Sequence, residues 1–295
     1  MAVPFQTYDA IGNREDLTDI IYDISPTDTP FISTVGKSKA KATYHEWQTD
    51  NLADATANNA VVEGADATFA DLAPTTRVGN YTQILRKTVT VSNTQDVVDK
   101  AGRNKETAYQ LTKASKEIKR DLEMTALSNN VADAGTDATP RKMAGIQTWL
   151  TTNTVDGAAG AFTEDMLKDA VKQAFESGGT PTMLLVTPTQ KQVVSEFTGI
   201  AGQRYMAPKS SPTTIIGAAD VYLSDFGTLS VVPDRFLTPE CALVIDPTMY
   251  SMAYLRPFQQ QELAKTGDST KHMMLTEVTL QAKNEASSAI ISNIV

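Results

Sequence analysis

The chain has 295 residues, of which 41% are hydrophobic and 21% are charged, a composition typical of a folded protein with a sizeable core and unlike that of disordered, fibrous or membrane-embedded chains. Its net charge of −9 argues against nucleic-acid binding through a continuous basic surface and leaves room only for a local basic stripe. No stretch reaches the roughly 20 apolar residues of a membrane helix, and the start lacks the pattern of a secretory signal, so we expect a cytoplasmic product.

The first segment, residues 1–40, has too few core-forming residues to fold alone. Apolar spacing over 17–24 predicts a short helix that Pro26 ends. We expect an acidic arm that lies on another surface. Over residues 1–35 its charge is −5, from one arginine (Arg14) against six acids: Asp9, Glu15, Asp16, Asp19, Asp23 and Asp28.

Two alternating runs, 41–48 and 78–91, predict β-strands. The stretch between them is much longer than an ordinary hairpin turn, and loops of this length are usually functional or disordered. Residues 49–76 of it contain no lysine or arginine, and their acids lack the spacing of a calcium-binding loop. We therefore expect a loop that faces solvent or a partner. Its five acids are Asp50, Asp54, Glu63, Asp66 and Asp71.

The clearest helix is predicted over 103–127, which contains no glycine or proline. Its narrow apolar face predicts packing on a sheet along one side, with the basic side outward. Residues 100–123 carry seven basic and four acidic side chains, a balance of +3. The expected apolar positions are Ala108, Leu111, Ser115, Ile118, Leu122 and Thr125.

Residues 151–245 read as a compact α/β unit. Thr163 is a predicted helix cap, Gly178 suits the end of that helix, and Thr187 with Gln190 forms a predicted capping box. Strands are expected over 214–223, 229–232 and 242–245. The tail, 246–295, predicts a strand pair with a turn at 266–268, which would complete the sheet under the long helix and make 151–245 an insertion.

Three short motifs could carry chemistry. Ser38 and Lys41 match S-x-x-K and residues 265–267 match K-T-G, the elements of serine acyl transfer, but Ser38 enters a strand and no S-D-N element exists. Asp225-Phe226-Gly227 is predicted to be a turn. His45 and His272 are expected at ordinary sheet positions, and Cys241 as a small buried side chain without a metal-binding neighbour.

The order of these parts resembles the major capsid protein of tailed bacteriophages with the Hong Kong 97 phage fold. The likeness is greatest in "TYDAIGNREDLTDIIYDISPTDTPFISTVGKSKAKATYHEWQTD" and in "RPFQQQELAKTGDSTKHMMLTEVTLQAKNEASSAIISNI". The resemblance implies an α+β fold with an N-terminal arm at 1–40 and an extended loop at 41–92. It also implies a spine helix at about 100–128 in a peripheral domain of 93–150 and 246–295, and an axial domain at 151–245.

The function implied is that of a structural subunit, without a cofactor or metal, that assembles as hexamers and pentamers into an icosahedral shell around double-stranded DNA. Its expected partners are copies of itself, a separate scaffolding protein, a portal, decoration proteins and the packaged DNA. Two alternatives stay open, an encapsulin-like bacterial compartment and an acyl-transfer enzyme using Ser38 and Lys41.

Charge balance predicts which residues meet across subunit boundaries. We expect the acidic arm to cross the basic side of a neighbour's long helix, and the acids of the loop to meet basic groups of another subunit. The predicted contact residues are Asp16, Asp19, Asp23, Asp28, Asp54, Glu63, Asp66, Asp71, Lys113, Lys116, Lys119 and Arg120.

Overall fold

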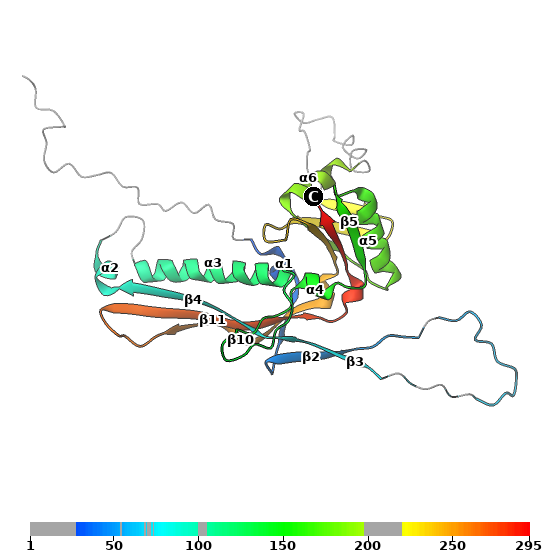
Figure 1. The fold of residues 1–295 in the computed structure, drawn as a ribbon, viewed down its shortest axis with the longest axis horizontal. Helices are drawn as coiled ribbons and strands as arrows, with labels where there is room; N and C mark the ends of the chain where they lie inside the picture. The colour runs from blue at the N-terminus through cyan, green and yellow to red at the C-terminus, as the bar shows by residue number, and fades with distance from the viewer. Residues whose placement is uncertain are drawn as a thin grey trace, which may run out of the picture.

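The computed structural model describes residues 28–53, 55–67, 69, 72, 74–99, 105–197 and 220–295. These residues form two larger β-sheets, each with helices packed on it, and a separate two-stranded ribbon (Figure 1). The expected helix over 17–24 lies outside the described residues.

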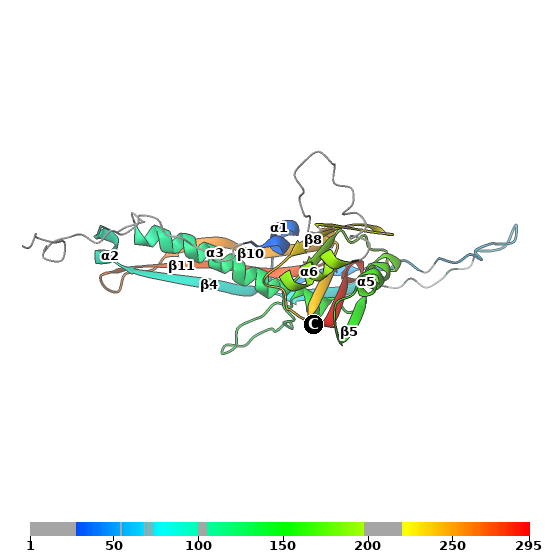
Figure 2. The same ribbon diagram turned by 90° about the horizontal axis from the view of Figure 1, so that it is seen from above.

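The first sheet is long and carries the long helix along its length, as Figures 1 and 2 show. β10 and β11 form the hairpin expected around 266–268, β4 pairs antiparallel with β11, and β1 pairs parallel with β10. α3 contacts β4 and β11, so the tail and the long helix belong to one unit, as predicted. The elements are β1 (Gly36–Lys39), β10 (Tyr250–Glu262), β11 (Ser269–Ala282), β4 (Gln83–Ser92), α2 (Asn93–Val97) and α3 (Glu106–Leu127).

α3 differs from the predicted helix at its start and in its buried face. It begins at Glu106 instead of 103, because Lys105 has extended backbone angles (φ −128°, ψ 129°). The buried face follows one i, i+4 row, since such rows are inclined to the helix axis where a helix packs. The prediction was right at Ile118 and Leu122 and wrong at the other four positions, which are exposed or half-buried. The buried apolar row is Ala114, Ile118, Leu122 and Ala126.

The second sheet has six strands and includes the last strand of the chain. β12 lies between β5, to which it is parallel, and β9, to which it is antiparallel. The prediction that all of 246–295 completes the sheet under the long helix is therefore wrong for 289–294. The spatial order is β5 (Thr154–Gly160), β12 (Ala289–Ile294), β9 (Cys241–Ile245), β6 (Met183–Val186), β8 (Gly227–Pro233) and β7 (Val221–Ser224).

The helices of this second unit start where the sequence predicts. The Thr163 hydroxyl caps α5 (Glu164–Glu176), which ends near Gly178 at φ +85°. The reciprocal capping box of Thr187 and Gln190 starts α6 (Pro188–Glu196). Asp225 and Phe226 form a tight turn between β7 and β8, as expected.

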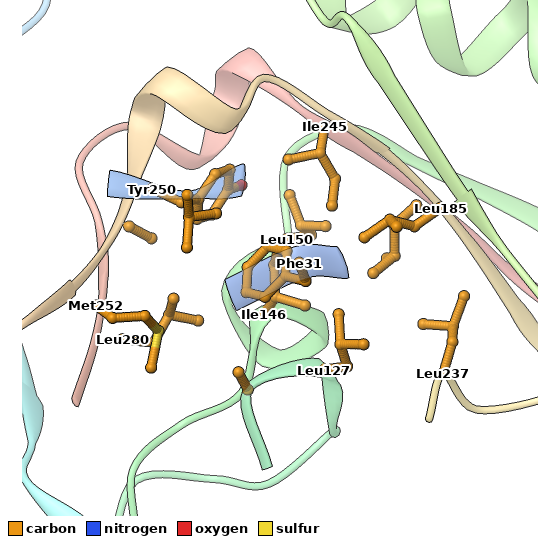
Figure 3. Packing of buried hydrophobic residues seen from close by; sticks show 14 of the residues in the cluster. Phe31, Leu127, Ile146, Leu150, Leu185, Leu237, Ile245, Tyr250, Met252 and Leu280 are labelled. Carbon is orange, nitrogen blue, oxygen red and sulfur yellow. The ribbon is translucent and has the colours of Figure 1, made fainter. Parts of the chain in front are cut away.

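The six-stranded sheet separates two hydrophobic cores. Alternate residues of a strand point to opposite faces, so Leu243 of β9 enters one core and its neighbour Val244 enters the other. α5 and α6 cover the second core. The first core extends to Met252 and Leu280 of the four-stranded sheet (Figure 3). The two units therefore share one core, unlike a simple insertion.

Residues 30–39 belong to the body instead of a free arm. α1 (Pro30–Thr34) places Phe31 in the middle of the first core, against Tyr250 at a ring separation of 6.4 Å (Figure 3). β1 follows at the edge of the four-stranded sheet. α4 (Ile146–Trp149) and two short 3₁₀ turns, η3 (Pro247–Met249) and η4 (Glu285–Ser287), complete the described elements.

The predicted strand 78–91 is two strands in two different sheets. β3 (Thr76–Tyr81) pairs with β2 (Tyr44–Thr49), while β4 starts after Thr82 and joins the four-stranded sheet. Thr82 is buried, and its hydroxyl donates to Glu277 at 2.9 Å, which fixes the chain where it changes sheet. The strand expected at 41–48 starts only at Tyr44.

Candidate intersubunit surfaces

The β2–β3 ribbon forms a stalk that projects from the body (Figure 1). The Tyr44 and Tyr81 rings lie 4.6 Å apart across its strands, and the Arg77 guanidinium pairs with Glu46 at 2.8 Å. Gly79 is required because an added Cβ would lie 2.9 Å from the His45 carbonyl oxygen. Midway along the ribbon, the Trp47 ring packs 5.4 Å from that of Trp149 in α4.

The loop beyond the stalk, residues 50–75, exposes large apolar side chains to solvent. Burying such side chains is the main favourable term in folding and association, so their full exposure marks a surface that another molecule covers. They are Leu52 (98% exposed), Val61 (81%), Val62 (80%), Phe69 (96%) and Leu72 (96%).

The structure describes only some of the acids that were predicted to contact a neighbour from this loop. Glu63 and Asp66 are exposed, next to a turn in which the Ala65 N–H donates to the Val62 carbonyl at 3.1 Å. Asp54 and Asp71 lie outside the described residues. No group of three His, Cys, Asp or Glu residues suited to a metal ion occurs in the described part of the chain.

The predicted basic positions of α3 face outward. Lys113, Lys116 and Lys119 are exposed, and Lys113 approaches Glu117 at 3.9 Å. Arg120 is half-buried, with its guanidinium 5.7 Å from the centre of the Phe236 ring. Among the predicted arm acids, Asp28 is exposed, and Asp16, Asp19 and Asp23 lie outside the described residues.

The residues of the acyl-transfer motif are not assembled. Ser38 lies on β1, and its hydroxyl is 3.3 Å from both the Ser251 hydroxyl and Gln281 Oε1. Its register partner is Ala253, whereas Lys265 follows the far end of β10. Nine residues of strand separate the two places, about 30 Å at ~3.3 Å per residue. Lys41 is exposed in the connection after β1.

The remaining motif residues have structural positions, as expected. His45 and His272 lie on β2 and β11, and His45 packs beside Trp47 at a ring separation of 6.0 Å. Cys241 is buried in β9, where burial raises the pKa of its thiol to about 12. No helix among the described residues is both long and apolar enough to cross a lipid bilayer.

Among the buried carboxyl groups, three that the sequence analysis missed have partners far away along the chain. Glu277 accepts hydrogen bonds from Arg141 and Arg256, each at 2.7 Å, as well as from Thr82. Glu123 and Asp234 are buried side by side at the junction of the two sheets. Nothing in the local sequence marks them, because their partners lie far away along the chain.

Residues 4–295 match the family model described as SU10 major capsid protein. The chain belongs to this family. The major capsid protein of Escherichia phage Phieco32 is 27% identical over 346 aligned residues, covering 97% of this chain and 96% of that protein. The prediction that the chain is a phage major capsid protein is thereby confirmed. As a capsid protein, the chain is a component of the virion.

Solved structures support the fold of this capsid protein. The capsid of cyanophage A-1(L) has a TM-score of 0.70 at 11% identity and covers 98% of each chain. The SrpI encapsulin of Synechococcus elongatus PCC 7942 has a TM-score of 0.62 at 12% identity, with 96% of this chain and 92% of that chain covered. At such low identity these likenesses concern the fold alone. The α+β, Hong Kong 97-like fold predicted from the sequence is confirmed, and the family favours the phage over the encapsulin.

Proposed function

We propose that the capsid protein assembles as hexamers and pentamers into an icosahedral head that encloses double-stranded DNA, and that assembly takes place in the bacterial cytoplasm. In this proposal the four-stranded sheet and α3 form the peripheral domain, and the six-stranded sheet forms the axial domain at the centre of each hexamer or pentamer. The chain acts as a structural subunit and not as an enzyme.

One observation carries this proposal: the β2–β3 loop holds apolar side chains that its own subunit does not cover. The stalk keeps the loop away from the body, so a neighbouring subunit is the natural surface to bury it. Each fully buried side chain of this size is worth roughly 1.5–3 kcal/mol. Such contacts are modest singly but add together when every subunit engages several neighbours at once.

Charge would set the register of these contacts. We propose that the acidic arm lies on the basic side of a neighbour's α3, where Lys113, Lys116 and Lys119 are exposed. The acids of the loop, including Glu63 and Asp66, would meet basic groups of another subunit. Surface pairs of this kind steer encounter and orientation more than they add affinity.

The other partners follow from the role of a phage head. We propose a separate scaffolding protein during assembly, a portal at one vertex and decoration proteins on the outside. DNA inside would be contacted without sequence preference, because the net charge of −9 leaves only local basic groups for phosphates.

Negative-stain microscopy of the purified protein tests the proposal. Closed shells or ring-shaped hexamers are expected, and a protein that stays monomeric at high concentration would refute self-assembly. A variant lacking residues 52–72 should fold but fail to form stable shells, since it keeps the stalk and loses the apolar loop. Shells that enclose a protein cargo instead of DNA in the producing cell would favour the compartment function.

A further inference from the structure

Two carboxyl groups are buried where the two sheets meet. Glu123, near the end of α3, is 0% exposed, and Asp234, just after β8, is 1% exposed. The two side chains lie within hydrogen-bonding range of each other. Two carboxylates in this position would place two negative charges in one space that water does not reach, which is strongly unfavourable.

Glu123 is held from one side by the start of α1. Its Oε1 accepts a hydrogen bond from the Phe31 N–H at 2.7 Å, and its Oε2 accepts one from the Ile32 N–H at 2.9 Å. Thr29, the residue before α1, makes no side-chain capping bond. Glu123 thus caps α1 from a distant part of the chain, and these bonds fix the orientation of its carboxyl group.

Asp234 is held on one oxygen only. Its Oδ1 accepts from the Phe236 N–H at 2.7 Å, and its own N–H donates to the Val186 carbonyl at 2.8 Å. Among the described residues, no N–H or hydroxyl group donates to the buried Oδ2. Two carboxyl oxygens are both acceptors, so Glu123 and Asp234 can form a hydrogen bond with each other only through a proton.

Other charges on the packed elements do not fill this space. Asp28 before α1, Lys119 on α3 and Arg235 beside Asp234 are exposed, and the half-buried Arg120 lies over the Phe236 ring. Burial, the largest cause, and the charge of Asp234 together raise the pKa of Glu123 from 4.5 to about 8, against the two N–H bonds that lower it. Burial also raises the pKa of Asp234.

We propose that Glu123 and Asp234 hold one proton between them, and that this proton fastens the segment after β8, residues 234–240, to the end of α3. The segment connects β8 and β9 of the six-stranded sheet, and α3 packs on the four-stranded sheet. Loss of the proton leaves two facing anions, while the α1 N–H groups continue to hold Glu123. The 234–240 segment is therefore the part that moves away, carrying Leu237 out of the first core (Figure 3).

The direction of the pH effect follows from the raised pKa. The closed joint binds the proton more tightly than the open joint, in which Glu123 titrates near its ordinary value of 4.5. The stability that the proton adds is fully present below that value and is lost as the pH rises through about 8. The joint is thus closed in mildly acidic solution and loosened in alkaline solution.

Hydrogen exchange of the 234–240 segment in the full-length protein tests the proposal. The exchange rate is measured from pH 5 to 9 and divided by the rate expected for the unfolded chain at the same pH. Light scattering verifies that the assembly state is the same at every pH. In the unmodified protein the open fraction should rise about tenfold per pH unit and level off above about pH 8. A flat profile overturns the proposal.

Three variants make the assignment specific. Glu123→Gln cannot titrate; its amide nitrogen can donate to Asp234 but can no longer accept one of the two α1 N–H bonds. Its profile should be flat, and a slope like that of the unmodified protein overturns the proposal. Glu117→Gln, on the same helix but half-exposed and paired with Lys113, is the control and should keep the slope. If Glu123→Gln does not fold, Asp234→Asn is used instead. Its open fraction should level off at a lower pH than in the unmodified protein, and an unchanged levelling-off pH refutes the shared proton.

Discussion

Replacing the apolar side chains of the β2–β3 loop with serine should separate folding from assembly. The five positions, Leu52, Val61, Val62, Phe69 and Leu72, are 80–98% exposed in the subunit. Exposed substitutions away from packed features usually change the free energy of unfolding by less than about 0.5 kcal/mol. The melting temperature of the unassembled subunit should therefore stay the same.

The effect on assembly should be large. At roughly 1.5–3 kcal/mol for each fully buried side chain, the five residues together set an upper limit of roughly 7–15 kcal/mol per loop. Ordering the loop and docking it consume part of this energy. A net loss of only about 3 kcal/mol per subunit would still raise the protein concentration needed for assembly about 100-fold.

Sedimentation velocity over a concentration series measures this threshold, and thermal unfolding of the subunit supplies the stability. The matched control replaces Asn58 and Asn59, exposed polar residues of the same loop, with serine. Two results would refute the reasoning. Assembly at the unmodified threshold would mean that no neighbour buries these side chains, and a clearly lower melting temperature would mean that the loop packs on its own subunit.

Three further predictions concern other parts of the chain. Glu277→Gln should lower the free energy of unfolding by roughly 1–3 kcal/mol in chemical denaturation, because it breaks two charge-assisted hydrogen bonds while the two arginines stay partly in contact with water. Cys241 should resist thiol reagents at pH 8 while the protein is folded, because a pKa of about 12 leaves only about one thiol in ten thousand ionised, and it should react at once after unfolding. Charge reversal on α3 should weaken assembly at low salt and have less effect at high salt, where exposed charges are screened; the positions are Lys113, Lys116 and Lys119.

Each of these predictions has a clear contrary outcome. Glu46→Gln breaks an exposed ion pair with Arg77 and should lower the free energy of unfolding by less than about 1 kcal/mol. An equal decrease in both glutamine variants would mean that Glu277 contributes no more to stability than an exposed ion pair. Rapid labelling of folded protein would place Cys241 at the surface. Unchanged assembly of the charge-reversed protein at low salt would remove the proposed contact between the arm and α3.

Local patterns were reliable where neighbours in the sequence decide the structure. The capping residues Thr163 and Thr187 started their helices as predicted, because a cap bonds to backbone N–H groups only two or three residues away. The long helix and the β10–β11 hairpin were likewise predictable from periodicity and turn residues. The order of these elements was enough to indicate the capsid family.

Distant pairing was decided only by the tertiary structure. The pattern over 78–91 is continuous, yet the chain changes sheet at Thr82 because Glu277, 195 residues away, binds its hydroxyl. β12 joined the six-stranded sheet because its apolar residues supply both cores, as a strand buried on two faces must.

The sequence by itself therefore determined the elements, the family and the presence of an uncovered loop between two strands. The tertiary structure alone decided which strands share a sheet and which carboxyl groups are buried together. Periodicity and capping act within a few residues, whereas the environment of Glu123 is set by Phe31 and Asp234, which lie about a hundred residues away on either side of it.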